Sequence, residues 1–167
     1  MTPPLLVFGW GNLSRGDDAL GLLCVAALRE GLPDARRGQV EFLEDYQLQI
    51  EHALDLVGRQ RVLFVDASLS CRAPFELTPL RALQDASFTS HAMSAPALLQ
   101  VYQNLRREAP PPCTQLAIRG ECFELGNPPS IGALLNLAAA VQWAERWLAQ
   151  QGHSSGQAIC KKCCQPK

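Results

Sequence analysis

The sequence predicts an α/β domain with three layers, in which a twisted and mostly parallel sheet is flanked by helices on both faces. Short apolar runs of strand length recur at residues 5–10, 40–43, 61–66 and 114–119. Segments with helical spacing of apolar residues separate most of these runs, and this alternation is typical of a parallel or mixed sheet covered on both sides. The chain has 167 residues, of which 47% are hydrophobic, which is enough for one domain with a sizeable core.

Composition and charge exclude several classes of function. The net charge is -1, so the overall charge gives no reason to expect binding to nucleic acid or to an anionic membrane. No apolar run approaches the roughly 18 residues that span a bilayer, and no basic segment precedes the first apolar run as in a signal peptide. The seven cysteines are odd in number and scattered, which favours reduced thiols, with Cys24 in the core. We therefore expect a cytoplasmic monomer.

The first strand leads into a glycine-rich turn and a helix. Residues 5–10 have no polar side chain to mark a solvent face, and Gly9, Gly11 and Gly16 allow sharp turns of the backbone. A helix is expected over residues 17–31, with Asp17 as its N-cap and Asp18 in its first turn. Gly31 and Pro33 mark its end.

Three interpretations of this turn remain open. A dinucleotide-binding turn would have the pattern G-x-G-x-x-G, but Ser14 occupies the third glycine position. Asp17 and Asp18 would also repel a phosphate at the start of the helix, and the same pair would attract a cation. In the simplest interpretation, both carboxylates only cap the helix and complement its dipole.

The middle of the chain continues the alternation. A strand at residues 40–43 is followed by polar residues and then by a helix expected over residues 49–58. The apolar spacing of this helix predicts a buried face of four residues: Ile50, Ala53, Leu54 and Val57. His52 is expected on the exposed side. The third strand, residues 61–66, ends in the carboxylate of Asp66.

The second half is expected to add an edge strand or hairpin within residues 71–80 and a polar loop over 81–94 that carries His91. The remaining expected elements are a helix over 95–107, strands at 114–119 and 121–125, and a helix over 130–150. The last helix has an apolar face of five residues: Leu134, Leu137, Val141, Ala144 and Leu148. We expect residues 1–150 to form a single domain, and residues 151–167 to form a flexible tail with cysteines and lysines.

Three polar side chains are expected to converge at one edge of the sheet. Ligands of such sheets bind beyond the carboxyl ends of the strands. This rule places Asp18 near Asp66, and His91 follows in the loop after the third strand. Two carboxylates and an imidazole suit a divalent ion with open coordination positions. Alternatively, Asp66 binds turn amides and His91 is an exposed loop histidine.

Three stretches of the sequence together form a recognisable pattern. They are residues 9–21 (Gly-Trp-Gly-Asn-Leu-Ser-Arg-Gly-Asp-Asp-Ala-Leu-Gly), residues 64–67 (Phe-Val-Asp-Ala) and the pair Ser90-His91 before a helix. It resembles the hydrogenase maturation endopeptidases, which process the large subunit of nickel–iron hydrogenases. The resemblance extends over about residues 5–150 and implies a twisted sheet between helices. Ala19 departs from the family pattern, which often has glycine there.

A second departure concerns the segment after the second strand. Many members have a glycine-rich Asp-Gly-Gly-Thr type of loop, whereas this chain has Tyr-Gln-Leu-Gln-Ile-Glu at residues 46–51. This pattern is similar to the subgroup that serves soluble, NAD(P)-linked bidirectional hydrogenases. Gln47 and Glu51 are therefore expected to select the substrate, and Asn12 is a further expected substrate-binding residue.

The resemblance also implies roles for the other candidate residues. Asp18, Asp66 and His91 match the metal-binding positions, and Asp18 and Asp66 are the candidate catalytic residues of an aspartyl-type endopeptidase. The expected metal is nickel already installed in the substrate, with another divalent ion in the free protein as an alternative. The expected partner is the precursor of the hydrogenase large subunit, which would lose its C-terminal extension. A non-catalytic chaperone that checks the metal of the precursor would use the same three residues.

Overall fold

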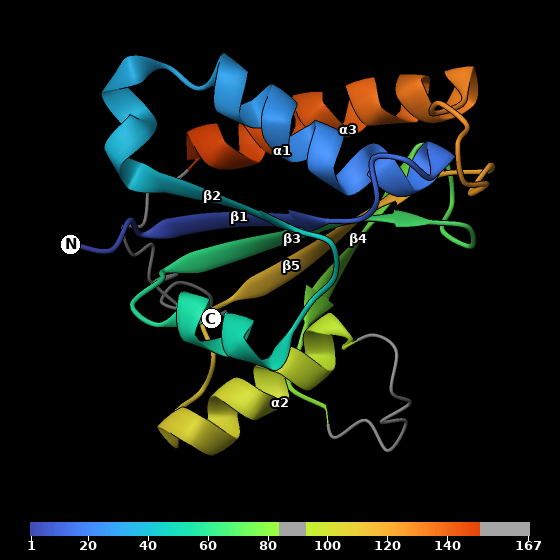
Figure 1. Ribbon diagram of the computed structural model, residues 1–167. Coiled ribbons are helices and arrows are strands. Elements are labelled where there is room, and N and C mark those ends of the chain that lie inside the picture. Colours follow the sequence, from blue (N-terminus) through green and yellow to red (C-terminus); the bar gives the residue numbers. More distant parts are fainter. Residues whose placement is uncertain (84–92, 151–167) are drawn as a thin grey trace, which may run out of the picture.

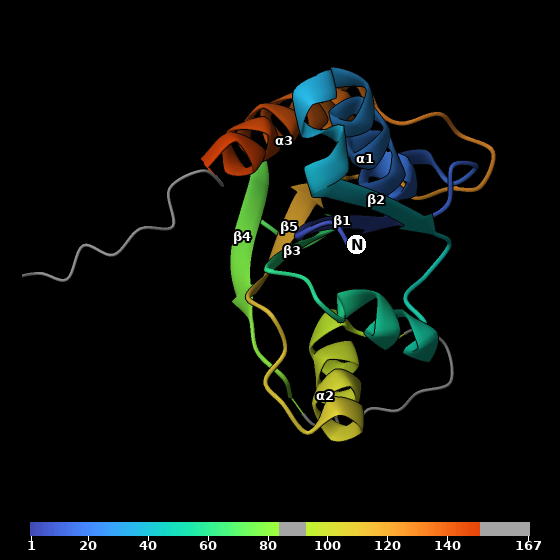
Figure 2. The ribbon, with the colours of Figure 1, turned by 90° about the vertical axis from the view of Figure 1, so that its left-hand side faces the viewer.

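The computed structural model describes residues 1–83 and 93–150 and has the predicted α/β architecture. A five-stranded sheet with the order β2-β1-β3-β5-β4 forms the middle layer. Helices α1 and α3 cover one face of this sheet, and α2 with the short helix η3 covers the other (Figures 1 and 2). The prediction of a mostly parallel sheet between two helical layers is confirmed.

Four strands are parallel and one edge strand is antiparallel. The strands are β1 (Leu5–Trp10), β2 (Val40–Asp45), β3 (Arg61–Ser68), β4 (Phe75–Leu80) and β5 (Cys113–Arg119). β1 pairs in parallel with β2 and β3, β3 pairs in parallel with β5, and β4 pairs antiparallel with β5. The central strands β1 and β3 are buried on both faces, as their unbroken apolar runs predicted. Their carboxyl ends lie at the same edge of the sheet.

The helices bury one apolar stripe each against the sheet. The helices with α geometry are α1 (Leu20–Gly31), α2 (Ala95–Arg106) and α3 (Ile131–Ala149). Ser94 and Ser130 are the N-caps of α2 and α3, and their side chains accept hydrogen bonds from Ala97 and Ala133 respectively. Cys24 of α1 is fully buried in the core, as predicted. No helix in the described ranges has the length and apolar character needed to cross a bilayer.

Residues 49–58 do not form the expected α-helix. They contain the tighter 3₁₀ helix η3 (Ile50–Leu56), and a second 3₁₀ helix, η2 (Asp34–Gln39), precedes β2. Ala53 and Leu56 are the buried residues of η3, three positions apart as one 3₁₀ turn requires, whereas Ile50 and Leu54 are 54% and 62% exposed. The predicted burial of Ile50 and Leu54 was therefore wrong.

Two further predictions were wrong: the strand at residues 121–125 and part of the buried face of α3. Residues 121–125 form no strand, because the N–H groups of Glu121 and Cys122 donate to a side chain and not to a neighbouring strand. Leu134 is 44% exposed, and the buried residues of α3 are Ala133, Ala140, Ala144, Trp147 and Leu148. Small alanines therefore bring α3 close to α1 and the sheet.

Candidate active site

The first turn of α1 lies directly against the ends of β1 and β3. A Cβ atom on Gly21 would overlap the backbone carbonyl oxygens of Trp10 and Val65, and a Cβ on Gly9 would overlap the carbonyl oxygen of Gly21. These glycines therefore permit a helix-to-strand approach that a larger residue would prevent. The approach brings the turn that precedes α1, the 3₁₀ helix η1 (Gly16–Ala19), to the carboxyl edge of the sheet.

Asp17 is a structural residue and is not the predicted N-cap. It lies inside η1 with no exposed surface, and α1 begins at Leu20. Its carboxylate accepts hydrogen bonds from the backbone N–H groups of Glu121, Cys122 and Ser130 and from the Ser130 hydroxyl. Burial raises the pKa of Asp17, but these four donors outweigh that effect and lower it below its usual value. Asp17 thus anchors the loop between β5 and α3.

Asp18, the next residue, is left available at the surface of the site. Its carboxylate is half-buried, and Oδ2 accepts a hydrogen bond of 3.2 Å from the backbone N–H of Asn12. Gly11, with φ of 142°, wraps the turn so closely that a Cβ there would overlap the carbonyl oxygen of Asp18. The glycine-rich turn therefore holds Asp18 above the end of β1.

Asp66 lies near the carboxyl end of β3 and is half-buried. Burial, with a smaller contribution from the negative charge of Asp18, raises the pKa of its carboxyl group to about 7. Hydrogen bonds from the Ala67 N–H, at 2.8 Å, and from the side chain of Trp10 act in the opposite direction. Asp66 is therefore an acid–base group that changes its protonation near neutral pH.

The two carboxylates form an acidic pair that a cation would stabilise. The charge of Asp18 acts on the titration of Asp66, so the two side chains lie within electrostatic reach of each other. A divalent ion would neutralise this repulsion, and carboxylates are suitable ligands for it. In residues 1–83 and 93–150 no three potential metal-binding side chains come together. The predicted third ligand, His91, lies outside the described residues.

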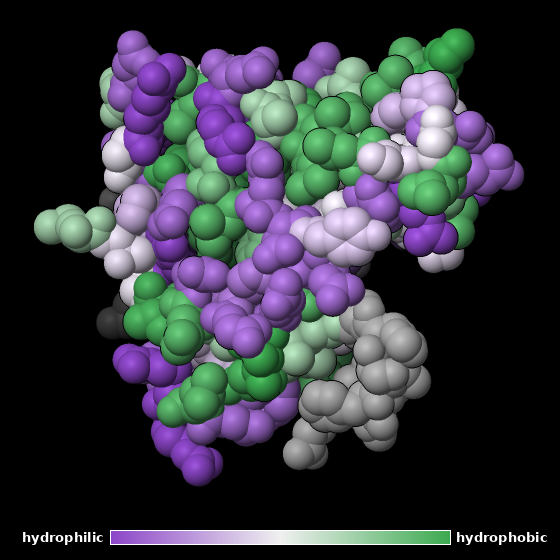
Figure 3. All heavy atoms as spheres, in the orientation of Figure 1, coloured by the Kyte–Doolittle hydropathy of each residue, from purple (hydrophilic) through white to green (hydrophobic). Residues whose placement is uncertain are grey.

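Of the predicted substrate-binding residues, Asn12 lies at the same edge. Asn12 is in the turn after β1, and its side-chain Nδ2 donates to the Tyr46 hydroxyl at 3.0 Å. Gln47 and Glu51 are exposed on the segment that follows β2, and the last residue of β2 is level with the last residue of β1 in the sheet. In the space-filling view, the surface over the end of β2 and this segment is mostly hydrophilic (Figure 3).

His52 lies in a different environment from the one that the sequence predicted. It was expected on the exposed face of a helix, but only 15% of its side chain is exposed. Nε2 lies 3.1 Å from Oδ2 of Asp45, and Nδ1 accepts the N–H of Gln49 at 2.9 Å. Its ring also contacts Phe8 edge to face, with 4.6 Å between ring centroids. Because η3 is a 3₁₀ helix, the α-helical spacing placed this side chain on the wrong face.

Comparison with solved structures identifies proteins with the same fold. The hydrogenase maturating endopeptidase HybD from E. coli aligns with a TM-score of 0.68 and 22% identity, over 89% of this chain and 93% of that one. The nickel–iron hydrogenase maturation protease HycI from Thermococcus kodakarensis KOD1 aligns with a TM-score of 0.67 and 21% identity, over the same shares of the two chains. This chain has the fold of the hydrogenase maturation proteases.

A third structure with the same fold comes from another archaeon. The hydrogenase 2 maturation peptidase from Thaumarchaeota archaeon SCGC_AB-539-E09 aligns with a TM-score of 0.61 and 23% identity, over 87% of this chain and 97% of that one. No family model matches the sequence, and no curated protein is significantly similar to it. The maturation-protease fold, with nearly complete coverage of both chains, therefore agrees with the resemblance seen in the sequence motifs.

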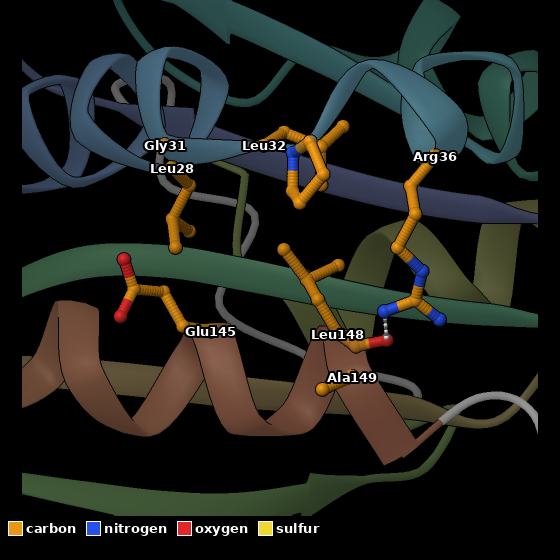
Figure 4. Close-up of a pocket in the computed structure, with 8 residues that line it drawn as sticks. Leu28, Gly31, Leu32, Arg36, Glu145, Leu148 and Ala149 are labelled. Carbon is orange, nitrogen blue, oxygen red and sulfur yellow. Dashed lines mark hydrogen bonds between the residues drawn. The ribbon is translucent and has the colours of Figure 1, made fainter.

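A surface pocket lies away from the acidic pair. It has a volume of about 240 Å³ and is formed by the end of α1, the start of η2 and the end of α3 (Figure 4). Its polar groups are Glu145 and Arg36, and Nη1 of Arg36 donates to the carbonyl oxygen of Leu148 at 2.7 Å. Because α1 begins beside Asp18 and ends at this pocket, the two places are separated by the length of the helix. The pocket is not part of the candidate site.

Proposed function

We propose that this protein is an endopeptidase that removes the C-terminal extension from the large-subunit precursor of a nickel–iron hydrogenase. The main support is the acidic pair at the carboxyl edge of the sheet, where the glycine-rich turn positions Asp18 and β3 positions Asp66. The pKa of Asp66, at about 7, suits a group that must exchange protons near neutral pH. The similar solved structures named hydrogenase maturation proteases support the choice of substrate class.

The nickel in this proposal belongs to the substrate and is not a resident cofactor. Asp18 and Asp66 would hold the ion in the precursor, with His91 as the third ligand, and a precursor without nickel would bind poorly. The acidic pair fits this role because a cation removes the repulsion between Asp18 and Asp66, which adds to the effect of burial on the pKa of Asp66. Alternatively, a divalent ion bound by the free protein would supply the positive charge between the two carboxylates.

Cleavage would be hydrolysis of one peptide bond. Asp18 or Asp66, whichever is not fully engaged with nickel, would accept a proton from the attacking water, and the proton would pass to the leaving amine. The metal would polarise the water or the carbonyl group. The products are a large subunit with a new carboxyl terminus and the released extension.

Asn12, Gln47 and Glu51 are the proposed substrate-binding residues. The exposure of Gln47 and Glu51 supports a role in selecting the precursor over a role in chemistry. Their sequence pattern favours the precursor of a soluble, NAD-reducing hydrogenase. We propose that the protein acts on it in the cytoplasm, as a monomer.

The strongest alternative is a chaperone that binds the nickel-loaded precursor and checks its metal while another protein cuts it. This alternative uses the same acidic pair, so geometry does not separate it from the protease. A measurement of turnover separates the two functions, because only the protease shortens many precursor molecules for each molecule of purified protein.

The variant Asp66→Asn tests the catalytic proposal. The amide keeps the shape of the side chain but lacks the charge that holds the cation and accepts the proton. We expect at least a hundredfold slower shortening of the precursor, followed by intact mass spectrometry. The matched control is Asp34→Asn, whose side chain is 88% exposed in η2; it should process at the wild-type rate. Full processing by Asp66→Asn would refute the proposed role.

A further inference from the structure

The end of β2 and the start of η3 are connected to both carboxylates of the candidate site through two separate chains of residues. One chain consists of hydrogen bonds and ends at Asp18, and the other consists of aromatic contacts and ends at Asp66. Both begin at the pair formed by Asp45 and His52. This arrangement suggests a function for residues that the proposed chemistry does not use.

The hydrogen-bonded chain connects β2 to the glycine-rich turn. The backbone carbonyl of Asp45 accepts the N–H of Gly11 at 3.2 Å, and Oδ1 of Asp45 accepts the N–H of Tyr46 at 2.6 Å. The Tyr46 hydroxyl then accepts the side-chain amide of Asn12 at 3.0 Å. The N–H of Asn12 in turn donates to the carboxylate of Asp18. Each link is a direct contact, so a change at Tyr46 reaches Asp18 through one residue.

Asn12 can make this connection in only one orientation of its side-chain amide. Its Oδ1 accepts the N–H of Ser14 at 2.9 Å, and its backbone carbonyl accepts the N–H of Arg15 at 3.1 Å. Nδ2 therefore faces Tyr46 and donates to it. With Oδ1 occupied by Ser14, the amide nitrogen is the donor and the Tyr46 hydroxyl is the acceptor in this link.

The aromatic chain connects the same segment to Asp66. The ring of His52 packs on Phe8, and Phe8 packs edge to face on Trp10 with 6.1 Å between ring centroids. The Trp10 side chain hydrogen-bonds to Asp66. These rings fix the direction from which the indole donates.

The pair formed by Asp45 and His52 holds Tyr46 in place. His52 accepts the N–H of Gln49 with one ring nitrogen and faces Asp45 with the other, so both ring nitrogens have a partner. Asp45 is then fixed between His52 and the backbone N–H of Tyr46. In contrast, 63% of Tyr46 is exposed to solvent beside the site. Tyr46 therefore combines a tethered hydroxyl with a freely accessible ring.

We propose that Tyr46 is a positioning residue of the candidate site, whose hydroxyl orients Asn12 and thereby Asp18 while its exposed ring contacts the substrate polypeptide. Asp45 and His52 support Tyr46 in this role. The inference rests on the proposed peptidase function and adds to it the route by which substrate contact reaches Asp18. It separates two effects: the hydroxyl acts on the rate of cleavage, and the ring acts on binding.

Tyr46→Phe in the full-length protein removes the hydroxyl and keeps the ring. We expect a three- to tenfold lower kcat for shortening the nickel-loaded precursor, with little change in KM, whereas Tyr46→Ala should raise KM as well. The control is Tyr102→Phe, because Tyr102 is the other tyrosine of the chain and its hydroxyl donates to Glu108 on the opposite side of the sheet from α1. It loses a hydroxyl hydrogen bond too, and kcat should stay unchanged.

Combination with Asn12→Ala tests whether the two residues act as one unit. If the hydroxyl acts through Asn12, adding Tyr46→Phe to Asn12→Ala should cause no further loss of kcat. Multiplied losses, or a wild-type kcat for Tyr46→Phe alone, would overturn the proposal.

An NMR readout tests the positioning without any need for cleavage. Tyr46→Phe should shift the backbone amide signals of Asn12 and Asp18, and Tyr102→Phe should leave them in place. Unchanged signals of Asn12 and Asp18 in Tyr46→Phe would overturn the positioning role. Failure of the wild-type protein to shorten any precursor would instead refute the proposed peptidase, while the amide signals would still decide the positioning.

Discussion

Two adjacent aspartates in the turn before α1 have different roles because they face different surroundings. Asp17 is fully buried and bonded to four donors of the loop between β5 and α3, whereas Asp18 is half-buried and faces the edge of the sheet. The sequence indicated two carboxylates at a helix start, but it could not distinguish them, since the partners of Asp17 lie more than 100 positions away. The folded chain shows that Asp17 is structural and that Asp18 stays accessible for the proposed chemistry.

The raised pKa of Asp66 predicts a stability that falls as the pH rises. In the unfolded chain Asp66 has the ordinary aspartate pKa of 3.8, and in the folded protein its pKa is about 7. Below pH 4 the group is protonated in both states and has no effect. Between pH 4 and 7 the unfolded state loses its proton first, so the folded state is destabilised progressively.

Asp66→Asn removes this pH-dependent penalty because the amide stays neutral. We expect the stability of the variant relative to wild type to be higher at pH 8 than at pH 4, by up to about 4 kcal/mol. Urea unfolding of the metal-free proteins at the two pH values measures this difference. Asp34→Asn, with its exposed side chain, should show a difference near zero. An equal effect of Asp66→Asn at both pH values would contradict the raised pKa.

At the scale of elements, regular patterns were predictable from the sequence and local exceptions were not. The buried strands, the glycine-rich turn and the three α-helices follow from apolar runs, periodicity and breakers. The 3₁₀ geometry of η3 changed the spacing from 3.6 to 3 residues per turn, so its buried face and the place of His52 were misassigned. Residues 121–125 have the composition of a strand, but the buried carboxylate of Asp17 takes the N–H groups that a strand would use.

The contact between α1 and the sheet predicts a sharp effect of one methyl group. Gly21→Ala would place a Cβ against the carbonyl oxygens of Trp10 and Val65, so the first turn of α1 must move away from the site. We expect a loss of about 2–4 kcal/mol in the free energy of unfolding and slower precursor processing. Gly38→Ala is the control, since no atom lies within 4 Å of its added Cβ. Wild-type stability of Gly21→Ala, measured by thermal unfolding, would show that the contact is less tight.

At the scale of the whole molecule, the strand order explains why residues 48 positions apart form one site. β1 and β3 are adjacent and parallel, so the turn after β1 and the end of β3 meet at one edge. The general rule for ligand sites in such sheets predicted this meeting of Asp18 and Asp66. The link from Tyr46 to Asn12 was not predictable, because it depends on side-chain hydrogen bonds between two loops.

Nickel-dependent cleavage is tested by a comparison of two forms of the same precursor. Purified protein is mixed with the hydrogenase large-subunit precursor, either loaded with nickel or free of it, and the intact mass of the product is determined. We predict a loss of mass at the C-terminus in the nickel-loaded sample alone, with many precursors cut for each protein molecule. Binding of the loaded precursor without any loss of mass would contradict the proposed peptidase and favour the chaperone.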